Sequence, residues 1–362
     1  MNQDISIQKV ERSGISEIDF NDIPFGRHFT DHMFVADFYD GQWNDLRIVP
    51  FGHMSVHPAT TSLHYGQAIF EGMKAYKTAS GGVQVFRPAM NAKRFNVSAE
   101  RMAMPTVPEN LFLNALEQLL QIDHQWVPST EGSSLYIRPY MFATDECVGI
   151  KPAEKFRFVI FASPVGPYYP KPVKVLVADK YVRAFKGGVG NVKAAGNYAA
   201  TLKAVQEANI QGYDQVLCMD GVEFKYIHEI GTMNVFFVID GRVVTPTLDE
   251  EAILHGITRD SVISILKEKN IPVEERRLSI EEVHQAYLEE KLDDAFGTGT
   301  AATIAHISDI GYLGDNMELP VVENRFISNM LKRELRDIKL GRIADQHGWM
   351  EQVELPVEAV RG

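Results

Sequence analysis

A lysine among small residues is the first candidate for chemistry in this sequence. Lys193 lies in the run 190–198 (GNVKAAGNY), where small neighbours would let a bulky ligand approach its amine. A lysine attacks carbonyl groups when burial or nearby positive charge lowers the pKa of its ammonium group. The usual carbonyl partner of such a lysine is pyridoxal phosphate. The run leaves two alternatives open, because most lysines are solvated surface charges and Lys186 competes for the role.

Two glycine-containing loops could hold an anion. Residues 296–302 (FGTGTAA) superficially resemble a dinucleotide-binding loop, but residues 304–310 have the pattern of a strand and not of the required helix. What remains is a turn of small residues whose backbone N–H groups and hydroxyls could bind an anion. In residues 254–258 (LHGIT), backbone donors would meet the positive end of a helix that begins near Asp260, which suits a phosphate. The alternative is that Thr258 only caps this helix.

An acidic side chain stands at the entrance of an apolar strand. Glu229 lies in residues 226–234 (YIHEIGTMN), and the chain then becomes fully apolar. A carboxylate close to a buried segment is costly unless it is paired. A pyridinium nitrogen and an unidentified lysine or arginine are equally suitable partners at this point.

A tyrosine and an arginine share one face of a predicted strand. Residues 135–139 (LYIRP) alternate, so strand geometry places Tyr136 and Arg138 on one face and the apolar residues on the other. The two side chains could line a pocket with a polar tip, or they could form a solvent-exposed face.

Metal and hydrolase sites are weakly supported. His28 with His32, and His53 with His57, have the i, i+4 spacing of a helical metal pair. However, His57 precedes a proline, and neither pair contains the glutamate of an HExxH motif. No serine lies in a G-x-S-x-G turn. We therefore expect no metal.

Composition indicates a globular protein that binds small molecules. A chain of 362 residues usually forms more than one domain. The net charge of −12 and the scattered Lys and Arg residues argue against nucleic acid and anionic membranes as partners. The first residues contain no apolar stretch typical of a signal peptide, so we expect a cytoplasmic protein. Two cysteines are too few for a disulfide framework.

The order of predicted elements favours an α+β fold with two domains. Residues 163–172 (SPVGPYYPKP) contain four prolines and mark a junction. We predict a smaller N-terminal domain at 1–165, an interdomain loop at 166–178 and a larger C-terminal domain at 179–362. Turn signals at 220–221 and 240–241 (both DG) predict largely antiparallel sheets. Strands are expected at 156–162, 173–178, 215–219 and 235–239, and helices at 111–122, 199–208, 260–269 and 280–289.

Taken together, these motifs resemble those of the branched-chain amino acid aminotransferases, which are pyridoxal phosphate enzymes of fold type IV. The resemblance covers nearly the whole chain and keeps the family order. It runs through residues 25–26 (FG), 29–33 (FTDHM), 64–66 (HYG), 70–72 (FEG), 136–139 (YIRP), 163–168 (SPVGPY), 187–198, 229–234, 256–259 (GITR) and 297–301. The family fold implies two α/β-type domains with mixed, largely antiparallel sheets and the active site at their interface.

The resemblance assigns the cofactor-binding residues. It implies that Lys193 is the Schiff-base lysine and moves the proton between Cα and the cofactor, and that Tyr198 bonds its phenolic oxygen. Glu229 matches the partner of the pyridinium nitrogen. Arg94 matches the arginine that binds the cofactor phosphate. Further donors to the phosphate are implied at Gly256, Ile257, Thr258 and Thr300.

The resemblance also implies a substrate pocket and a homodimer. It places an apolar pocket at Phe25, Tyr65, Tyr136, Tyr168 and Thr232, with Thr300 and Ala301 near the α-carboxylate and Arg138 at the far carboxylate of glutamate. Val148 and Ile150 match a loop that enters the active site from the partner subunit. Animal members carry a C-x-x-C redox pair where this chain has Ala302 and Ala305, so the chain resembles the bacterial type.

The expected reaction is reversible transfer of the amino group of L-leucine, L-isoleucine or L-valine to 2-oxoglutarate, which gives glutamate and a branched 2-oxo acid. The resemblance implies a ping-pong cycle through pyridoxamine phosphate. D-amino acid aminotransferases and aminodeoxychorismate lyases of the same fold are the alternatives, and a non-enzymatic pyridoxal phosphate carrier is a more distant one.

Overall fold

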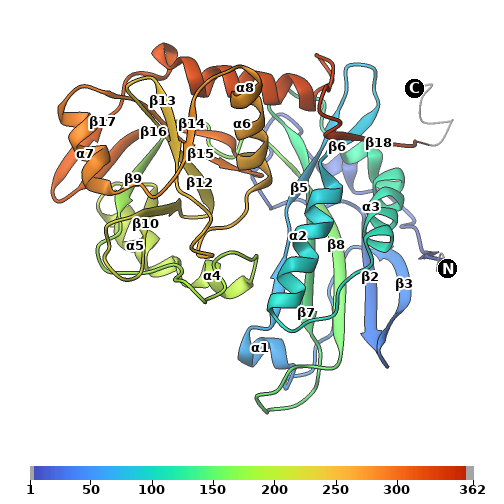
Figure 1. The fold of residues 1–362 in the computed structure, drawn as a ribbon. Helices are drawn as coiled ribbons and strands as arrows, with labels where there is room; N and C mark the ends of the chain where they lie inside the picture. Colours follow the sequence, from blue (N-terminus) through green and yellow to red (C-terminus); the bar gives the residue numbers. More distant parts are fainter. Residues whose placement is uncertain (1–3, 356–362) are drawn as a thin grey trace. The chain divides into compact units, whose positions relative to one another are not determined.

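The computed structural model describes residues 4–355 and divides into two compact units (Figure 1). The first unit contains the described residues up to Tyr168 and those from Asp337 onward, and the second contains Tyr169–Arg336. Each unit is built around a sheet and has its own hydrophobic core. No helix within residues 4–355 is long and apolar enough to cross a membrane.

The first unit contains a sheet with almost entirely antiparallel pairing. The strand order is β1-β3-β2-β8-β7-β5-β6-β18, and β4 pairs with β7 outside this path. Among the described strands of this sheet, β1 and β3 form the one parallel pair. The strands are β1 (Ser6–Ile7), β2 (His32–Tyr39), β3 (Gln42–Pro50), β4 (Ala68–Phe70), β5 (Met73–Lys77), β6 (Val83–Phe86), β7 (Ser134–Ala143), β8 (Phe156–Val165) and β18 (Met350–Val353).

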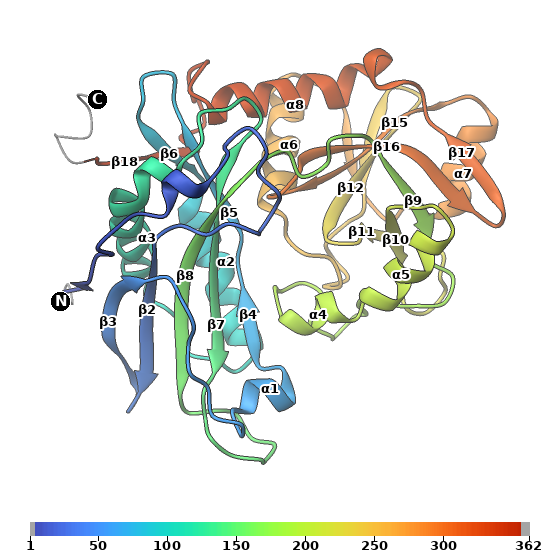
Figure 2. The same cartoon turned by 180° about the vertical axis from the view of Figure 1, so that it is seen from behind.

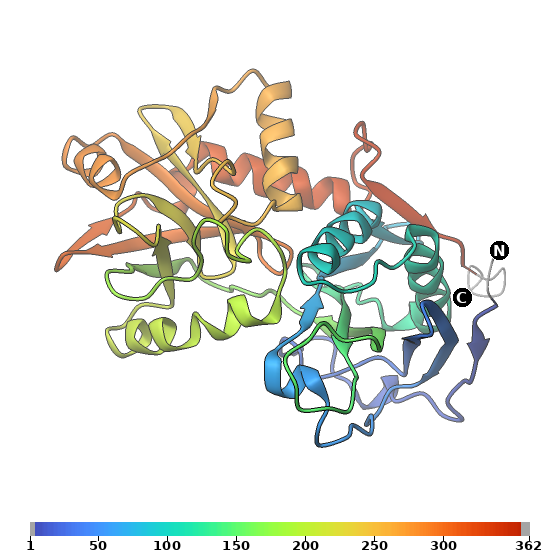
Figure 3. The ribbon, with the colours of Figure 1, turned by 60° about the horizontal axis from the view of Figure 1, so that its bottom comes forward.

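Two helices pack against this sheet. α2 (Pro88–Arg101) begins with a proline, whose missing N–H costs nothing in the first turn, and α3 (Glu109–Asp123) follows it. Apolar residues three and four positions apart give each helix a buried face. Phe95 of α2 and Phe112 of α3 both contact Phe158 of β8. Figure 3 shows the two helices side by side in teal. A short helix, α1 (Thr61–Tyr65), precedes β4.

The second unit contains a mixed sheet in which six strands close into a ring. The order is β11-β10-β9-β16-β15-β12-β13-β14, β17 pairs with β16, and an additional β11–β12 pairing closes the ring. Strands β9, β10 and β11 lie beside one another in Figure 2. The strands are β9 (Val173–Val177), β10 (Gln215–Met219), β11 (Ile227–Ile230), β12 (Met233–Ile239), β13 (Arg242–Thr245), β14 (Val273–Glu275), β15 (Leu292–Gly299), β16 (Thr303–Tyr312) and β17 (Asp315–Glu318).

The helices of the second unit connect these strands. They are α4 (Ala195–Ala199), α5 (Leu202–Ile210), α6 (Ile257–Glu268), α7 (Ile280–Leu288) and α8 (Phe326–Lys339), which ends in the first unit. Ser279 caps α7 by accepting a hydrogen bond from the Glu282 N–H at 3.1 Å. β12 is a central strand whose residues are nearly all buried, which explains why its sequence is continuously apolar.

The α+β prediction is confirmed, and most expected elements are present with shifted ends. The strand predicted at 215–219 coincides with β10, whereas α6 begins three residues before Asp260. Asp240 and Gly241 form the predicted tight hairpin, with φ of 49° and 73°. The turn predicted at Asp220 is longer, because its carboxylate accepts four backbone N–H bonds from residues 222–226. These bonds hold the pKa of Asp220 well below its usual range.

Three parts of the predicted domain division differ from the structure. The first unit is the larger of the two by the residues it spans, whereas we expected the N-terminal domain to be the smaller one. The segment from Asp337 onward belongs to the first unit, whereas we expected the second domain to extend to residue 362. The reason is β18, which pairs antiparallel with β6 and lies at the end of the strand order of the first sheet. The expected interdomain loop at 166–178 also contains a regular strand, β9, which pairs with β10 and β16.

Candidate active site

Lys193 lies one residue before Ala194, the N-cap of α4, in a loop of the second unit. Its Nζ donates a hydrogen bond to the Tyr198 hydroxyl at 2.8 Å. The buried Asn197 side chain of α4 donates to the carbonyls of Val189 and Val192. These two bonds tie the segment before the lysine to the helix that follows it. The competing Lys186 is exposed, whereas Lys193 is half-buried. The structure therefore favours Lys193 as the reactive amine.

The lysine loop requires a glycine at its closest approach. A Cβ atom on Gly190 would lie 2.3 Å from the Ala252 carbonyl oxygen and 2.4 Å from the Cβ of Ala184. The first atom belongs to the backbone and the second is attached directly to it, so neither can move aside as the end of a flexible side chain could. Gly190 is therefore needed for the close packing of the loop. The sequence pattern had suggested only that small residues here leave room for a ligand.

Glu229 is buried in β11, and both oxygens of its carboxylate have partners. Oε2 lies 2.9 Å from an Nη of Arg183, and both side chains are almost completely buried. Oε1 accepts hydrogen bonds from the Leu254 N–H at 2.9 Å and from the Asn234 amide at 3.2 Å. Of the two partners considered for Glu229, the structure provides the arginine. The charge-assisted contact favours the ionised form of the carboxylate.

These groups surround one cavity in the second unit. Arg183, Tyr198, Glu229 and Thr232 all line it, together with Val192, Asn197, Gly231 and Leu254. A phenol that contacts the lysine amine and an ionised carboxylate therefore face the same space. This donor set fits pyridoxal phosphate, which needs an amine for its carbonyl, a donor for its phenolic oxygen and a carboxylate for its ring nitrogen.

The predicted phosphate loop forms the start of α6. Gly256 is the N-cap residue and makes no side-chain capping bond, so the interpretation of Thr258 as the N-cap is wrong. Ile257 and Thr258 form the buried first turn. A Cβ on Gly256 would lie 1.9 Å from Oδ1 of Asn234, whose amide also contacts Glu229. The helix start and the Glu229 carboxylate are thus joined through one asparagine.

The turn containing Thr300 and Ala301 connects β15 to β16. A Cβ on Gly299 would lie 3.9 Å from the Thr232 carbonyl oxygen. β15 and β12 are neighbouring strands, which explains this proximity. The turn closes with Thr303, whose φ of 61° is a left-handed conformation. The structure therefore brings the Thr300 turn close to Thr232.

In the first unit, three of the predicted substrate residues form an aromatic cluster. The ring of Phe25 meets the ring of Tyr136 edge-on at 5.2 Å and that of Tyr168 at 4.7 Å. Arg138 donates to the Tyr136 hydroxyl at 2.9 Å, and its guanidinium lies 4.7 Å from the centre of the Phe70 ring. The side chains of Tyr136 and Arg138 are half-buried. The predicted alternation of β7 is therefore confirmed, and the alternative of a solvent-exposed face is wrong.

The other predicted residues of the first unit lie outside this cluster of rings. Tyr65 ends α1, and the apolar side chains of Val148 and Ile150 are exposed at 74% and 91%. Arg94 of α2 pairs with the fully buried Glu71, with Nε to Oε1 at 2.7 Å and Nη2 to Oε2 at 2.9 Å. This fork fixes the orientation of the Arg94 guanidinium.

Sequence reasoning missed three residues that hold the site together. Arg183 lies in no quoted motif, and Glu71 and Asn234 lie in the motifs at 70–72 and 229–234 without an assigned role. Glu71 was part of the quoted FEG match, but its residue type gave no sign of an arginine partner 23 positions away. Burial of a charged residue next to a predicted site is the signal that could have identified Arg183.

The histidine pairs do not form metal sites. His32 is buried, with Nδ1 2.7 Å from an Asp123 oxygen, and its Nε2 accepts a hydrogen bond from the Val10 N–H. Both ring nitrogens therefore have structural partners. His57 accepts a local hydrogen bond from the Ala59 N–H, which is an ordinary turn contact.

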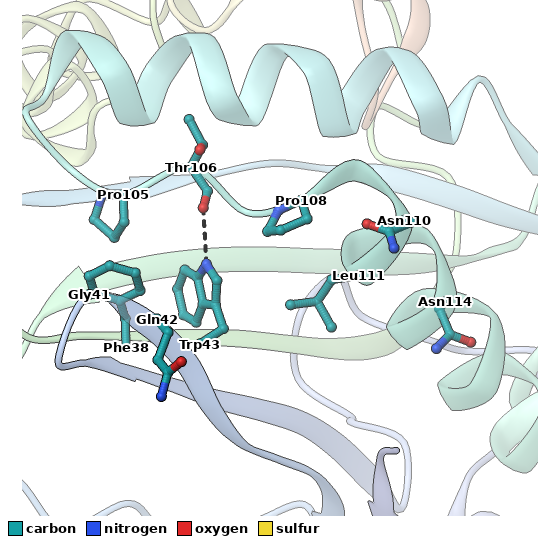
Figure 4. Close-up of a pocket in the computed structure, with 10 residues that line it drawn as sticks. All are labelled: Phe38, Gly41, Gln42, Trp43, Pro105, Thr106, Pro108, Asn110, Leu111 and Asn114. Carbon is teal, nitrogen blue, oxygen red and sulfur yellow. Dashed lines mark hydrogen bonds between the residues drawn. The ribbon is translucent and has the colours of Figure 1, made fainter. Parts of the chain in front are cut away.

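A larger pocket in the first unit lacks catalytic groups. It has a volume of about 640 Å³ and lies between the β2–β3 turn and the start of α3 (Figure 4). Its floor contains Phe38 and Trp43, and the Trp43 indole donates to the Thr106 carbonyl at 2.9 Å. The lining holds amides, prolines and the hydroxyl of Thr106 but no charged side chain. This pocket therefore offers no alternative to the Lys193 region as a candidate site.

Comparison with known proteins identifies the family. A model of the amino-transferase class IV family matches residues 68–310. The chain is 45% identical to branched-chain-amino-acid transaminase 1 of Bacillus subtilis (strain 168), over 92% of this chain and 95% of that protein. The chain belongs to the branched-chain amino acid aminotransferase family of the class IV aminotransferases.

Solved structures of this family have the same fold. The branched-chain amino acid aminotransferase of Escherichia coli matches with a TM-score of 0.75 at 28% identity, over 90% of this chain and 99% of that one. The T.th. branched-chain amino acid aminotransferase, in complex with N-(5'-phosphopyridoxyl)-L-glutamate, matches with a TM-score of 0.71 at 26% identity, over 88% and 98%. The expected fold type IV and the expected pyridoxal phosphate cofactor are thereby confirmed.

We expect activity to be insensitive to mild oxidation and to added reductant. The positions of the redox pair of animal members are Ala302 and Ala305, and the two cysteines of this aminotransferase are Cys147 and Cys218. Cys218 is buried, and burial raises the pKa of its thiol to about 11, which disfavours the reactive thiolate. Turnover should be measured after peroxide treatment, with and without dithiothreitol. A large loss that dithiothreitol reverses would show that one of these thiols controls the site.

Proposed function

We propose that this protein catalyses reversible amino transfer between L-leucine, L-isoleucine or L-valine and 2-oxoglutarate. The observation that carries this conclusion is the Lys193–Tyr198 contact beside the Glu229 cavity, in a chain that is 45% identical to a branched-chain-amino-acid transaminase. The buried charges and the reactive amine are more than a protein that only carries the cofactor would need.

The second unit provides the groups that hold and move protons. Pyridoxal phosphate, when bound, acts as the electron sink for negative charge at the substrate Cα. Lys193 carries the amine that binds the cofactor carbonyl and, once released, moves the proton at Cα as a general base and acid. Tyr198 lies 2.8 Å from Nζ, so its hydroxyl orients this amine and accepts its hydrogen bond. For the phosphate we propose Arg94, with donors from residues 256–258 and Thr300.

Glu229 is the proposed partner of the cofactor ring nitrogen. Arg183 and the Leu254 N–H stabilise the ionised form of its carboxylate, and a carboxylate is the group that keeps a pyridine nitrogen protonated. Arg183 also donates to the carbonyls of Gly190 and Ala252, so it ties Glu229 to the loop that carries Lys193. Arg183 is a positioning residue in this proposal.

We expect Glu229→Gln to retain the cofactor and to slow proton transfer about 100-fold or more, because about 1.4 kcal/mol of barrier corresponds to tenfold in rate. The neutral amide preserves shape but cannot hold a proton on the ring nitrogen. The cofactor affinity, measured by fluorescence, should therefore stay close to that of the wild type, whereas the single-turnover rate with L-leucine should fall. Glu207→Gln provides a comparison, because it makes the same change at a partly exposed side chain of α5 and leaves Glu229 unchanged. Wild-type single-turnover rates for Glu229→Gln would exclude the pairing.

Substrate recognition is proposed for the aromatic cluster of the first unit. Phe25, Tyr136 and Tyr168 present an apolar surface suited to branched side chains, with contributions from Tyr65 and Thr232. Arg138 shares the Tyr136 face of β7 and is proposed to pair with the distal carboxylate of glutamate. Thr300 and Ala301 are proposed for the α-carboxylate through their turn.

We also propose that the active form is a homodimer. Val148 and Ile150 are large apolar side chains that are strongly exposed, and burying them against a second copy would be favourable. The family resemblance places this loop at the active site of the partner subunit. The molar mass in solution tests the proposal, and Ile150→Asp should shift a dimer toward monomer.

One assay distinguishes this function from the related ones. The purified protein with pyridoxal phosphate should be tested on a panel of L- and D-amino acids with 2-oxoglutarate. We expect glutamate formation from L-leucine, L-isoleucine and L-valine. Turnover of D-alanine but not of L-leucine would indicate a D-amino acid aminotransferase. The absence of turnover with both amino acids would indicate a lyase or a carrier.

A further inference from the structure

A second cavity in the second unit has the features of an anion site. It has a volume of about 520 Å³, within the range of small-molecule sites, and lies between the start of the second unit, β16 and the segment that leads into α8. Apolar side chains, including Pro172, Ile304 and Leu319, line it together with Lys171 and Lys332. None of the residues assigned above to the cofactor or the amino-acid substrates lines this cavity.

The charges around this cavity do not cancel. Arg325 is buried and occupied, because it pairs with Asp294 and donates to the carbonyls of Pro320 and Ile307. Lys171 and Lys332 form no ion pair within residues 4–355, and Glu323 is the one acidic side chain in the lining. Two lysines against one glutamate leave one net positive charge. In a chain with a net charge of −12, this is a local exception.

A buried histidine in the wall lacks a partner. His306 of β16 is 6% exposed, and its Nδ1 is buried without a hydrogen bond in the described part of the chain. Burial, Lys332 and Arg325 lower the pKa of His306 to about 4, so the ring is neutral near pH 7. A buried polar atom without a partner is costly unless something else binds nearby. The 14-residue helix α8 begins at the same wall, and its N-terminus adds positive potential.

We propose that this cavity binds a small organic monoanion, a carboxylate carried on an apolar body. The carboxylate pairs with Lys171 and Lys332, and the apolar body packs against Pro172, Ile304 and Leu319. One net positive charge matches one carboxylate better than a dianionic phosphate, and the apolar wall has no role for a simple inorganic ion. The bound anion stands close enough to His306 to offset the positive charges that disfavour its imidazolium form.

The test is titration of the cofactor-loaded protein with benzoate as the probe. His306 is observed through ¹⁵N-histidine NMR and assigned by the signal that His306→Gln loses. We expect saturable changes with a Kd of about 1 mM or tighter, together with a higher titration midpoint for His306. Calorimetry on the same protein gives the benzoate affinity without this assignment. The test therefore does not depend on whether the His306→Gln variant folds.

Matched variants decide the outcome. Lys332→Gln should weaken benzoate binding at His306 at least about tenfold and leave turnover unchanged, because Lys332 is outside the active site. Lys203→Gln removes the same charge from α5 and should change neither. The proposal is overturned by the absence of saturable change up to about 20 mM benzoate. It is also overturned if Lys203→Gln weakens binding as much as Lys332→Gln, or if orthophosphate binds as tightly as benzoate. Because His306 reports locally, none of these results depends on the proposed catalytic activity.

Discussion

Lys193→Ala should eliminate covalent retention of pyridoxal phosphate and lower turnover by about 10⁴-fold or more, since it removes both the attachment point and the proton-transfer group. The structure gives the physical reason. Nζ is half-buried and held at 2.8 Å from the hydroxyl of Tyr198, which itself lines the Glu229 cavity. Borohydride reduction followed by peptide mass mapping measures the attachment, and a coupled leucine assay measures turnover.

Lys186→Ala is the matched control. Lys186 lies seven residues earlier on an exposed part of the same loop, so its loss should leave attachment and turnover at wild-type levels. Cofactor mapped to the peptide of Lys186, or full activity of Lys193→Ala, would refute the assignment. Tyr198→Phe is informative as a third variant, because it removes only the hydroxyl that contacts Nζ and should retain covalent attachment.

Local pattern was enough to predict most elements of the fold. Alternation along β7, the tight turn at Asp240 and the apolar run of β12 follow from rules that act over a few residues. The placement of β18 could not be predicted in this way. Its four residues are too short to show a period, and its pairing with β6 joins residues more than 260 positions apart.

Residues of the candidate site could be predicted where a sequence motif specifies them. They could not be predicted where their role depends on a partner that is distant in sequence. Lys193 and Tyr198 are five residues apart, so their contact is visible in the sequence once a short helix is assumed. The Arg183–Glu229 pair joins a residue of the loop after β9 to a residue of β11. No propensity or spacing rule connects them, and the same holds for Arg94 with Glu71.

A pocket that accepts both leucine and glutamate must tolerate an alkyl chain and a carboxylate in turn. An apolar wall alone rejects the carboxylate, and a fixed buried charge alone rejects the alkyl chain. Arg138 resolves this conflict in our proposal. Its stem can pack along apolar surface, while its guanidinium lies over the Phe70 ring and donates to the Tyr136 hydroxyl. The buried Nε of Arg138 has no hydrogen-bond partner in residues 4–355, so the guanidinium retains donor capacity.

Arg138→Met should therefore impair the glutamate half-reaction much more than the leucine half-reaction. Removing one partner of a desolvated charge pair costs about 2–5 kcal/mol, which corresponds to roughly 30-fold to several thousand-fold in kcat/KM. Methionine keeps most of the apolar wall, so leucine should lose less than about tenfold. Stopped-flow measurement of each half-reaction separately is the test. Arg47→Met, which removes a partly exposed arginine from the same sheet, controls for general effects on the fold. Equal losses for both substrates with Arg138→Met would make Arg138 a structural residue and refute this account of dual specificity.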